Sequence, residues 1–122
     1  MIKLDYGKTG ISLHPEKDWN IKVLFPKKQP KLKDPVFSIK KAIKHPIGTE
    51  TLDTLIQNKK SINDVCIVVS DSTRPIPSKI ILKGLIEVLI DLGIEYTHIT
   101  ILIATGLHRG SKKEDLYRII GK

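Results

Sequence analysis

The sequence predicts an α/β fold, with a Rossmann-like parallel sheet, flanking helices and a small antiparallel β meander before them. Two apolar runs, 65–69 and 99–103, carry this prediction. Continuous runs of valine and isoleucine are typical of strands buried on both faces of a parallel sheet. A segment with helical periodicity, 80–92, lies between them. A helical crossover makes the two strands parallel, with a right-handed connection as the default.

Size and composition predict a folded cytoplasmic protein. The chain has 122 residues, enough for one α/β domain over 1–122, and is 40% hydrophobic and 28% charged, which is typical of a globular chain. Its one cysteine, Cys66, lies in the first apolar run, so we expect a buried, inert thiol in a reducing compartment. The chain has no apolar run long enough for a membrane helix, and its N-terminus lacks the apolar core of a signal peptide.

The net charge of +8 suggests an anionic partner. Nucleic acid, an anionic membrane and a phosphorylated or carboxylate small molecule would all fit such a charge. The lysines are spread along the chain in pairs without a dense block, and aromatic residues make up only 5%. Nucleic-acid binding normally combines a basic groove with stacking aromatics. We therefore predict a small-molecule partner, and neither nucleic acid nor membrane.

Residues 1–35 are predicted to form the β meander and a linker. Apolar residues alternate at 2–6, 11–13 and 21–25, which indicates three short strands. The sequence at 7–9, Gly-Lys-Thr, resembles part of a phosphate-binding loop. The preceding part of that motif is missing, so we interpret it as a hairpin turn.

Residues 36–122 are predicted to hold the helices and the two β–α units. Ser38, Thr51 and Ser111 are placed to cap helices whose apolar residues follow at helical spacing. The helix at 80–92 carries a wide apolar stripe suited to packing on a sheet. Two β–α units are few for a parallel sheet, so we expect an incomplete domain, and exposed apolar surface on it could cause self-association.

The loops that follow the two apolar runs hold the candidate site. Ligands of open α/β sheets bind beyond the carboxyl ends of the strands. The first loop contains polar residues in sequence, and the second contains a glycine and a histidine: Asp71, Ser72, Thr73 and Arg74, then Gly106 and His108. If the two strands are neighbours, both loops face one crevice.

Arg74 is predicted to bind an anion. Its planar, permanently charged guanidinium suits a carboxylate or a phosphate. The alternative is a structural ion pair with Asp71, three residues earlier. Thr73 and the free N–H groups near the next helix could add donors for an anion, or Thr73 could simply cap that helix.

His108 is the candidate acid–base residue. Gly106 lets the backbone turn tightly and present the imidazole, whose ordinary pKa of about 6.5 suits proton transfer. The neighbouring Arg109 would favour the neutral form that accepts a proton. The alternative is a solvated surface histidine. The spacing of the other histidines, the cysteine and the acidic residues makes no complete metal site.

Four segments resemble the nickel-dependent lactate racemase family, specifically its N-terminal domain. They follow the family order and span most of the chain: 5–10 (DYGKTG), 45–48 (HPIG), 68–77 (VVSDSTRPIP) and 99–109 (ITILIATGLHR). The last two together make the resemblance specific.

The resemblance implies a two-domain racemase that interconverts the two enantiomers of a 2-hydroxy acid. It implies a nickel-pincer nucleotide, derived from nicotinic acid mononucleotide, as hydride acceptor. His108 would take the substrate hydroxyl proton and Arg74 would hold the substrate carboxylate. Asp71, Ser72, Thr73, Arg74 and Gly106 would lie beside the cofactor.

The family pattern also requires residues that this chain does not match. A second histidine, a cofactor-bearing lysine and a nickel-binding histidine would lie beyond Lys122. We therefore expect no metal site within this chain and no catalysis by the chain alone. The alternative is a non-catalytic basic α/β module that binds a nucleotide or another phosphorylated small molecule.

Overall fold

The structure is a computed structural model that describes residues 1–59, 62 and 64–121. It divides into two compact units, Met1–Lys31 and Leu32–Lys122, each described by itself below. The predicted organisation, one domain over 1–122 with an internal boundary at 35, stays a prediction. In the described ranges, no helix combines the length and the apolar character needed to cross a membrane.

The N-terminal unit is a two-stranded antiparallel hairpin. Strands β1 (Ile2–Leu4) and β2 (Ile11–Leu13) pair, and the intervening turn has positive φ at Gly7 and Gly10. A side chain at Gly10 would lie 2.9 Å from the carbonyl oxygen of Leu4, so this position requires glycine. The turn confirms the interpretation of 7–9 as a hairpin loop.

The prediction of a third strand in the meander, at 21–25, is wrong. The structure assigns no strand to this segment, and its apolar side chains are exposed, with Phe25 at 83%. Alternation predicts a strand only where a partner strand accepts the backbone hydrogen bonds and a core covers one face. This unit contains no buried residue, so it offers no such face.

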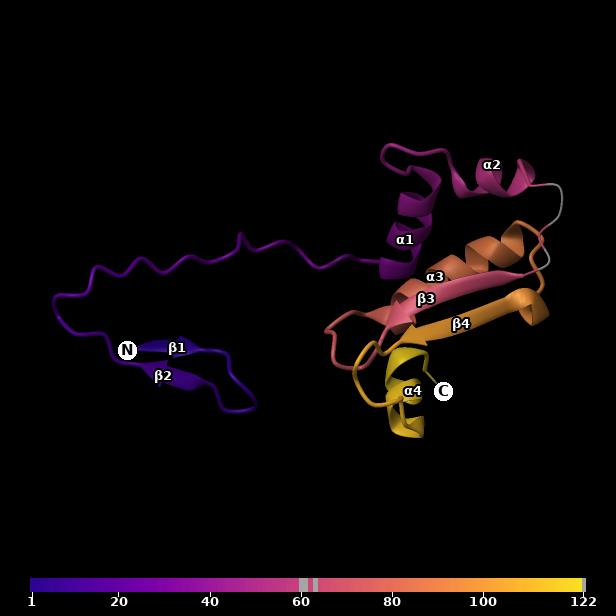
Figure 1. Ribbon diagram of the computed structural model, residues 1–122. Coiled ribbons are helices and arrows are strands. Elements are labelled where there is room, and N and C mark those ends of the chain that lie inside the picture. The colour runs from indigo at the N-terminus through magenta and orange to yellow at the C-terminus, as the bar shows by residue number, and fades with distance from the viewer. Residues whose placement is uncertain (60–61, 63, 122) are drawn as a thin grey trace. The chain divides into compact units, whose positions relative to one another are not determined.

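The second unit is built on two adjacent parallel strands, β3 (Val65–Ser70) and β4 (Ile99–Ala104), as predicted (Figure 1). The chain crosses between them through helix α3 (Ser78–Asp91) and the 3₁₀ turn η1 (Tyr96–His98). The register pairs Val65 with Ile99 and Ser70 with Ala104, so the two strands end side by side.

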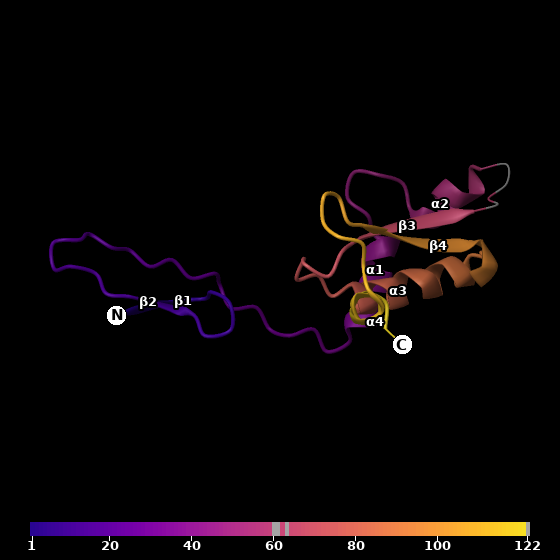
Figure 2. The same ribbon diagram turned by 60° about the horizontal axis from the view of Figure 1, so that its bottom comes forward.

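Helices cover one face of this sheet. Figure 2 shows α3 and α4 (Lys113–Ile119) on the same side of the two strands. Leu82, Val88 and Leu89 of α3 are buried. On the other face, Val68 is 61% exposed and Leu102 is 52% exposed.

The prediction that both faces are buried is therefore wrong for the described residues, and so is the burial of Cys66, which is exposed on the open face. An apolar run shows that a strand suits two covered faces. It does not show that the covering elements are present.

Two of the three predicted helix caps need correction. Helix α1 (Pro35–Lys44) begins after Asp34, whose carboxylate accepts from the backbone N–H of Phe37 at 2.9 Å. Ser38 lies inside the helix, because a proline at the first helical position starts it earlier. Helix α4 begins after Lys112 and not at Ser111. Thr51 does precede helix α2 (Leu52–Gln57), as predicted.

The start of helix α4 is anchored by the buried carboxylate of Asp115. It accepts hydrogen bonds from the backbone N–H of Lys112, the guanidinium of Arg109 and the hydroxyl of Ser72, at 3.0, 2.8 and 3.0 Å. These three donors, in that order of effect, lower the pKa of Asp115 from 3.8 to about 2. The carboxylate is therefore ionised throughout the neutral range.

Helix α1 packs closely against Gly84, which is buried in α3. A Cβ at this position would lie 2.8 Å from Cγ2 and 3.1 Å from Cβ of Ile39 in α1. Ile39 is β-branched, so its side chain has little freedom to move aside.

We predict that Gly84→Ala destabilises the chain by about 1 kcal/mol. Alanine favours a helix by roughly 1 kcal/mol over glycine, but overpacking costs about 1–3 kcal/mol, so the clash dominates. Urea unfolding followed by circular dichroism measures the difference. In an Ile39→Ala background the cost should shrink, whereas a stabilised Gly84→Ala chain would show that the helices can separate freely.

We predict that Asp115 shapes the acid unfolding of this unit. Its folded-state pKa lies below the ordinary value, so its stabilisation is complete above pH 3.8 and is lost as the pH falls through about 2. Asp115→Asn should therefore be less stable at neutral pH and lose less stability between pH 3.8 and 2. Acid titrations by circular dichroism measure this, with Glu114→Gln as the matched control because Glu114 is exposed in the same turn. Parallel acid curves for the wild type and Asp115→Asn would contradict the assignment.

Candidate active site

The two predicted loops begin side by side at one edge of the parallel sheet. Ser70 and Ala104, the last residues of β3 and β4, are paired in the register, and each loop leaves its strand in the same direction (Figure 1). Parallel pairing is what puts both loops at the carboxyl edge.

A hollow of about 450 Å³ lies between these loops. It is lined by the ends of both strands and by both loops: Ser70, Asp71, Arg74, Ala104, Thr105, Gly106, Leu107 and His108. Arg74 and His108 therefore share one cavity, which confirms the spatial prediction. Ser72 and Thr73 lie outside it and line an adjoining hollow of about 50 Å³ with Arg109 and Asp115.

The imidazole of His108 is held by Asp71. Nδ1 of His108 lies 2.6 Å from Oδ2 of Asp71, whose residue is only 7% exposed. Oδ1 of the same carboxylate accepts from the hydroxyl of Thr73 at 2.6 Å and from its backbone N–H at 3.3 Å. The Thr73 hydroxyl first, and then His108, lower the pKa of Asp71 below its ordinary value.

An ionised Asp71 fixes the tautomer of His108. A carboxylate can only accept, so Nδ1 must carry the proton. In the neutral imidazole the lone pair then lies on Nε2, the ring nitrogen that Asp71 does not contact. Sequence reasoning missed this pair, and the signal that could have found it is a carboxylate directly after one parallel strand and a histidine in the next loop.

The guanidinium of Arg74 remains available for a ligand. The expected alternative, an ion pair with Asp71, is not formed, because the carboxylate of Asp71 is engaged by Thr73 and His108. Within the described part of the chain, Arg74 makes no ion pair, and its side chain is exposed. The backbone N–H of Arg74 closes the turn on the carbonyl of Asp71 at 3.3 Å.

Arg109 is paired instead. Its NH1 donates to Oδ2 of Asp115 at 2.8 Å. The charge closest to the imidazole of His108 is thus the carboxylate of Asp71 and not the guanidinium of Arg109.

Ser72 and Thr73 use their hydroxyl groups within the chain. Thr73 donates to Asp71, and Ser72 donates to Asp115 at 3.0 Å. Thr73 does not cap helix α3, which begins after Pro77. Gly106 has a φ of +57°, as a tight turn requires, and lines the larger hollow. Cofactor binding by these residues stays a prediction.

The described residues contain no metal-binding group. Across 1–59, 62 and 64–121, no three or more histidine, cysteine, aspartate or glutamate side chains gather where they could hold an ion. The remaining histidines do not line the hollow of about 450 Å³ between the two loops. His98 precedes the opposite end of β4.

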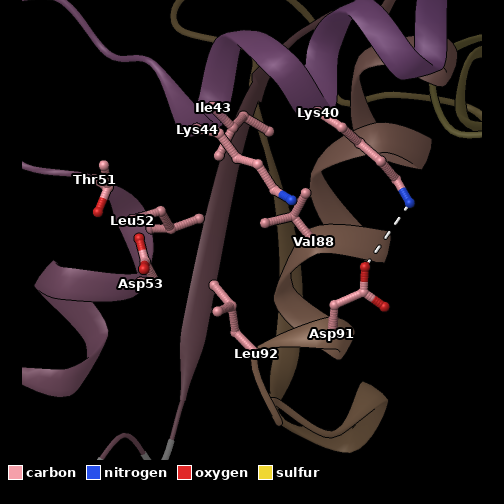
Figure 3. Close-up of a pocket in the computed structure, with 9 residues that line it drawn as sticks. All are labelled: Lys40, Ile43, Lys44, Thr51, Leu52, Asp53, Val88, Asp91 and Leu92. Carbon is pink, nitrogen blue, oxygen red and sulfur yellow. Dashed lines mark ion pairs between the residues drawn. The ribbon is translucent and has the colours of Figure 1, made fainter.

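A third hollow, of about 500 Å³, lies among helices α1, α2 and α3 (Figure 3). Its walls include Ile43, Leu52, Val88 and Leu92, and Figure 3 shows these side chains around it. Its Lys40 forms ion pairs with Glu87 at 2.6 Å and Asp91 at 3.9 Å. Its lining has no histidine or cysteine, and one of its two lysines, Lys40, is already paired, so we assign the candidate site to the loop hollow.

The chain is similar to known lactate racemases over most of its length. A lactate racemase of Thermoanaerobacterium thermosaccharolyticum is 38% identical over 84 residues, which is 69% of this chain and 19% of that protein. A lactate racemase of Lactiplantibacillus plantarum is 36% identical over 85 residues, 70% of this chain and 19% of that protein. The chain thus spans about a fifth of the length of these relatives.

A solved structure and a protein family also match this chain. The solved lactate racemase apoprotein from T. thermosaccharolyticum matches 73% of this chain and 20% of its own chain, with a TM-score of 0.58 and 33% identity. The lactate racemase N-terminal domain family matches residues 6–122. The chain therefore belongs to the lactate racemase N-terminal domain family.

Proposed function

We propose that this chain is the N-terminal substrate- and cofactor-binding part of a 2-hydroxyacid racemase of the lactate type. One observation carries the proposal: a histidine oriented by a carboxylate shares a hollow with an arginine that makes no ion pair among the described residues. The family membership of residues 6–122 supports the same reaction class.

The two side chains match the two polar groups of the substrate. A 2-hydroxy acid carries a carboxylate and a hydroxyl on adjacent carbons. The guanidinium of Arg74 can bind the carboxylate through two parallel hydrogen bonds, and Nε2 of His108 can accept the hydroxyl proton. Asp71 then stabilises the imidazolium that forms, as the buried carboxylate does in a catalytic triad.

The residues of this chain fit an anionic part of the implied nickel-pincer nucleotide, but not its metal. Arg74 and the turn at Gly106 line the hollow and could face a phosphate. The described ranges hold no group of metal ligands. When bound, the cofactor would supply the hydride acceptor, while this chain would hold the substrate carboxylate and move its hydroxyl proton.

The proposal includes the partner of the protein, its compartment and its self-association. A small 2-hydroxy acid is the partner, and the single cysteine suits a reducing cytoplasm. The exposed Val68 and Leu102 on the open sheet face support self-association of the chain when it is isolated.

We predict that the 122-residue chain alone does not racemise lactate. Its hollow is bounded by two loops of one sheet edge, and the described part holds no cluster of three or more metal-ligating side chains for the cofactor. The measurement is a chiral assay of L-lactate incubated with the purified chain and the nickel-pincer nucleotide. Turnover above that of the cofactor alone would contradict this prediction.

In the full-length polypeptide that contains this chain, we predict that His108→Ala lowers kcat by about 10²–10⁴-fold, the usual contribution of a general base. Arg74→Ala should lower kcat/KM by about 10–100-fold through loss of a charged hydrogen bond. Arg74→Lys should recover only part, because lysine lacks the planar fork. The assay follows racemisation of lactate by the cofactor-loaded protein.

Matched controls come from the same elements. His98→Ala removes a histidine before the opposite end of β4, and Arg118→Ala removes an exposed arginine of α4. Both should retain wild-type rates. Wild-type rates in His108→Ala and Arg74→Ala would instead remove the site assignment, and tight binding of a phosphorylated ligand without turnover would favour the non-catalytic module.

A further inference from the structure

Asp115 links the two loops of the candidate site through hydrogen bonds, in addition to the hydrogen bond between Asp71 and His108. This carboxylate belongs to the first turn of α4 and is 7% exposed. Its Oδ1 accepts from the hydroxyl of Ser72 in the first loop, and its Oδ2 accepts from the guanidinium of Arg109 in the second loop. Its Oδ2 also accepts from the backbone N–H of Lys112, which anchors it to the helix start.

These bonds stand next to the pair that carries the proposed chemistry. Ser72 follows Asp71, and Arg109 follows His108. Consecutive positions of each loop therefore make two separate links, Asp71 directly to His108 and Ser72 to Arg109 through Asp115. A single hydrogen bond lets one loop pivot against the other, whereas two adjacent links restrict that rotation.

Asp115 also separates the roles of the two arginines. Its carboxylate meets the charge of Arg109 at 2.8 Å. Arg74 has no carboxylate within ion-pair distance among the described residues. Of these two guanidinium groups, an incoming substrate carboxylate would therefore meet Arg74, which is not ion-paired within the described ranges and shares the hollow with His108.

We propose that Asp115 is a positioning residue that fixes the two loops relative to each other. Asp71 then keeps the imidazole of His108 oriented, and Arg74 remains the anion site. The expected effect of Asp115 on the reaction rate rests on the proposed function. Its expected effect on the orientation of His108 rests only on the hydrogen bond between Asp71 and His108.

The test uses the full-length protein with Asp115→Asn, and with Glu114→Gln as the matched control. Asp115→Asn should lower kcat/KM for lactate by about 10–100-fold, because small misplacements of catalytic groups cost about that much. Glu114→Gln removes the same charge from the same helical turn and should stay within about twofold of wild type. Rates are normalised to folded protein by circular dichroism.

A second readout does not depend on activity. In ¹⁵N-histidine-labelled protein, the Nδ1 proton of His108 should be protected from exchange with water in wild type and in Glu114→Gln. In Asp115→Asn that proton should exchange at least about tenfold faster, because the loop can pivot and break the bond to Asp71. A helix-stabilising role alone would leave this proton unchanged in the folded protein.

The two readouts separate the two proposals. If wild type does not racemise lactate, the proposed function fails, and the His108 proton still decides the role of Asp115. If Asp115→Asn does not fold, Ser72→Ala removes one of the three bonds and should lower kcat/KM about fivefold with faster exchange of the same proton. Protection equal to wild type in the folded variant overturns the role of Asp115.

Discussion

The parallel pairing of β3 and β4 is the constraint on which the candidate site depends. The strands are six residues each and are paired from Val65 with Ile99 to Ser70 with Ala104. A six-residue strand is about 20 Å long, so antiparallel pairing would separate the two loops by roughly that distance. The parallel arrangement instead starts both loops at one edge, where side chains 37 residues apart in sequence can form a hydrogen bond.

The hydrogen bond between Asp71 and His108 then gives the shared edge its chemical character. A loop histidine without a partner rotates freely and has either tautomer. Here a carboxylate that accepts from Thr73 as well fixes the ring through Nδ1. The same bond occupies Asp71, the carboxylate three residues before Arg74 that the sequence suggested as its partner. One contact therefore fixes the imidazole and also occupies the carboxylate of Asp71, while Arg74, which has no ion pair among the described residues, lines the same hollow.

Local sequence patterns predicted the elements but not the contacts between them. The apolar runs gave both strands, and Thr51 gave the start of α2, because strand propensity and helix starts depend on nearby residues. The position of Arg74 and His108 in the loops after two parallel strands singled them out, and the resemblance added their roles toward a substrate. The links of Asp71 to His108 and of Asp115 to Ser72 span 37 and 43 residues and depend on loop geometry and rotamers that no local pattern encodes. The burial of Cys66 was predicted wrongly because it depends on which elements cover the strand.

The openness of the hollow limits what these residues can do in this chain. The side chain of His108 is 53% exposed, and Arg74 is exposed as well, so water competes for both groups. An exposed ion pair contributes only about 0–1 kcal/mol, whereas hydrogen bonds to charged groups in a site closed to water contribute several times more. Under the proposed function, the same guanidinium and imidazole would therefore bind a 2-hydroxy acid weakly in this open hollow and tightly in a site closed to water. In the proposed function, Arg74 and His108 would supply the chemical match, and exclusion of water would supply most of the binding strength.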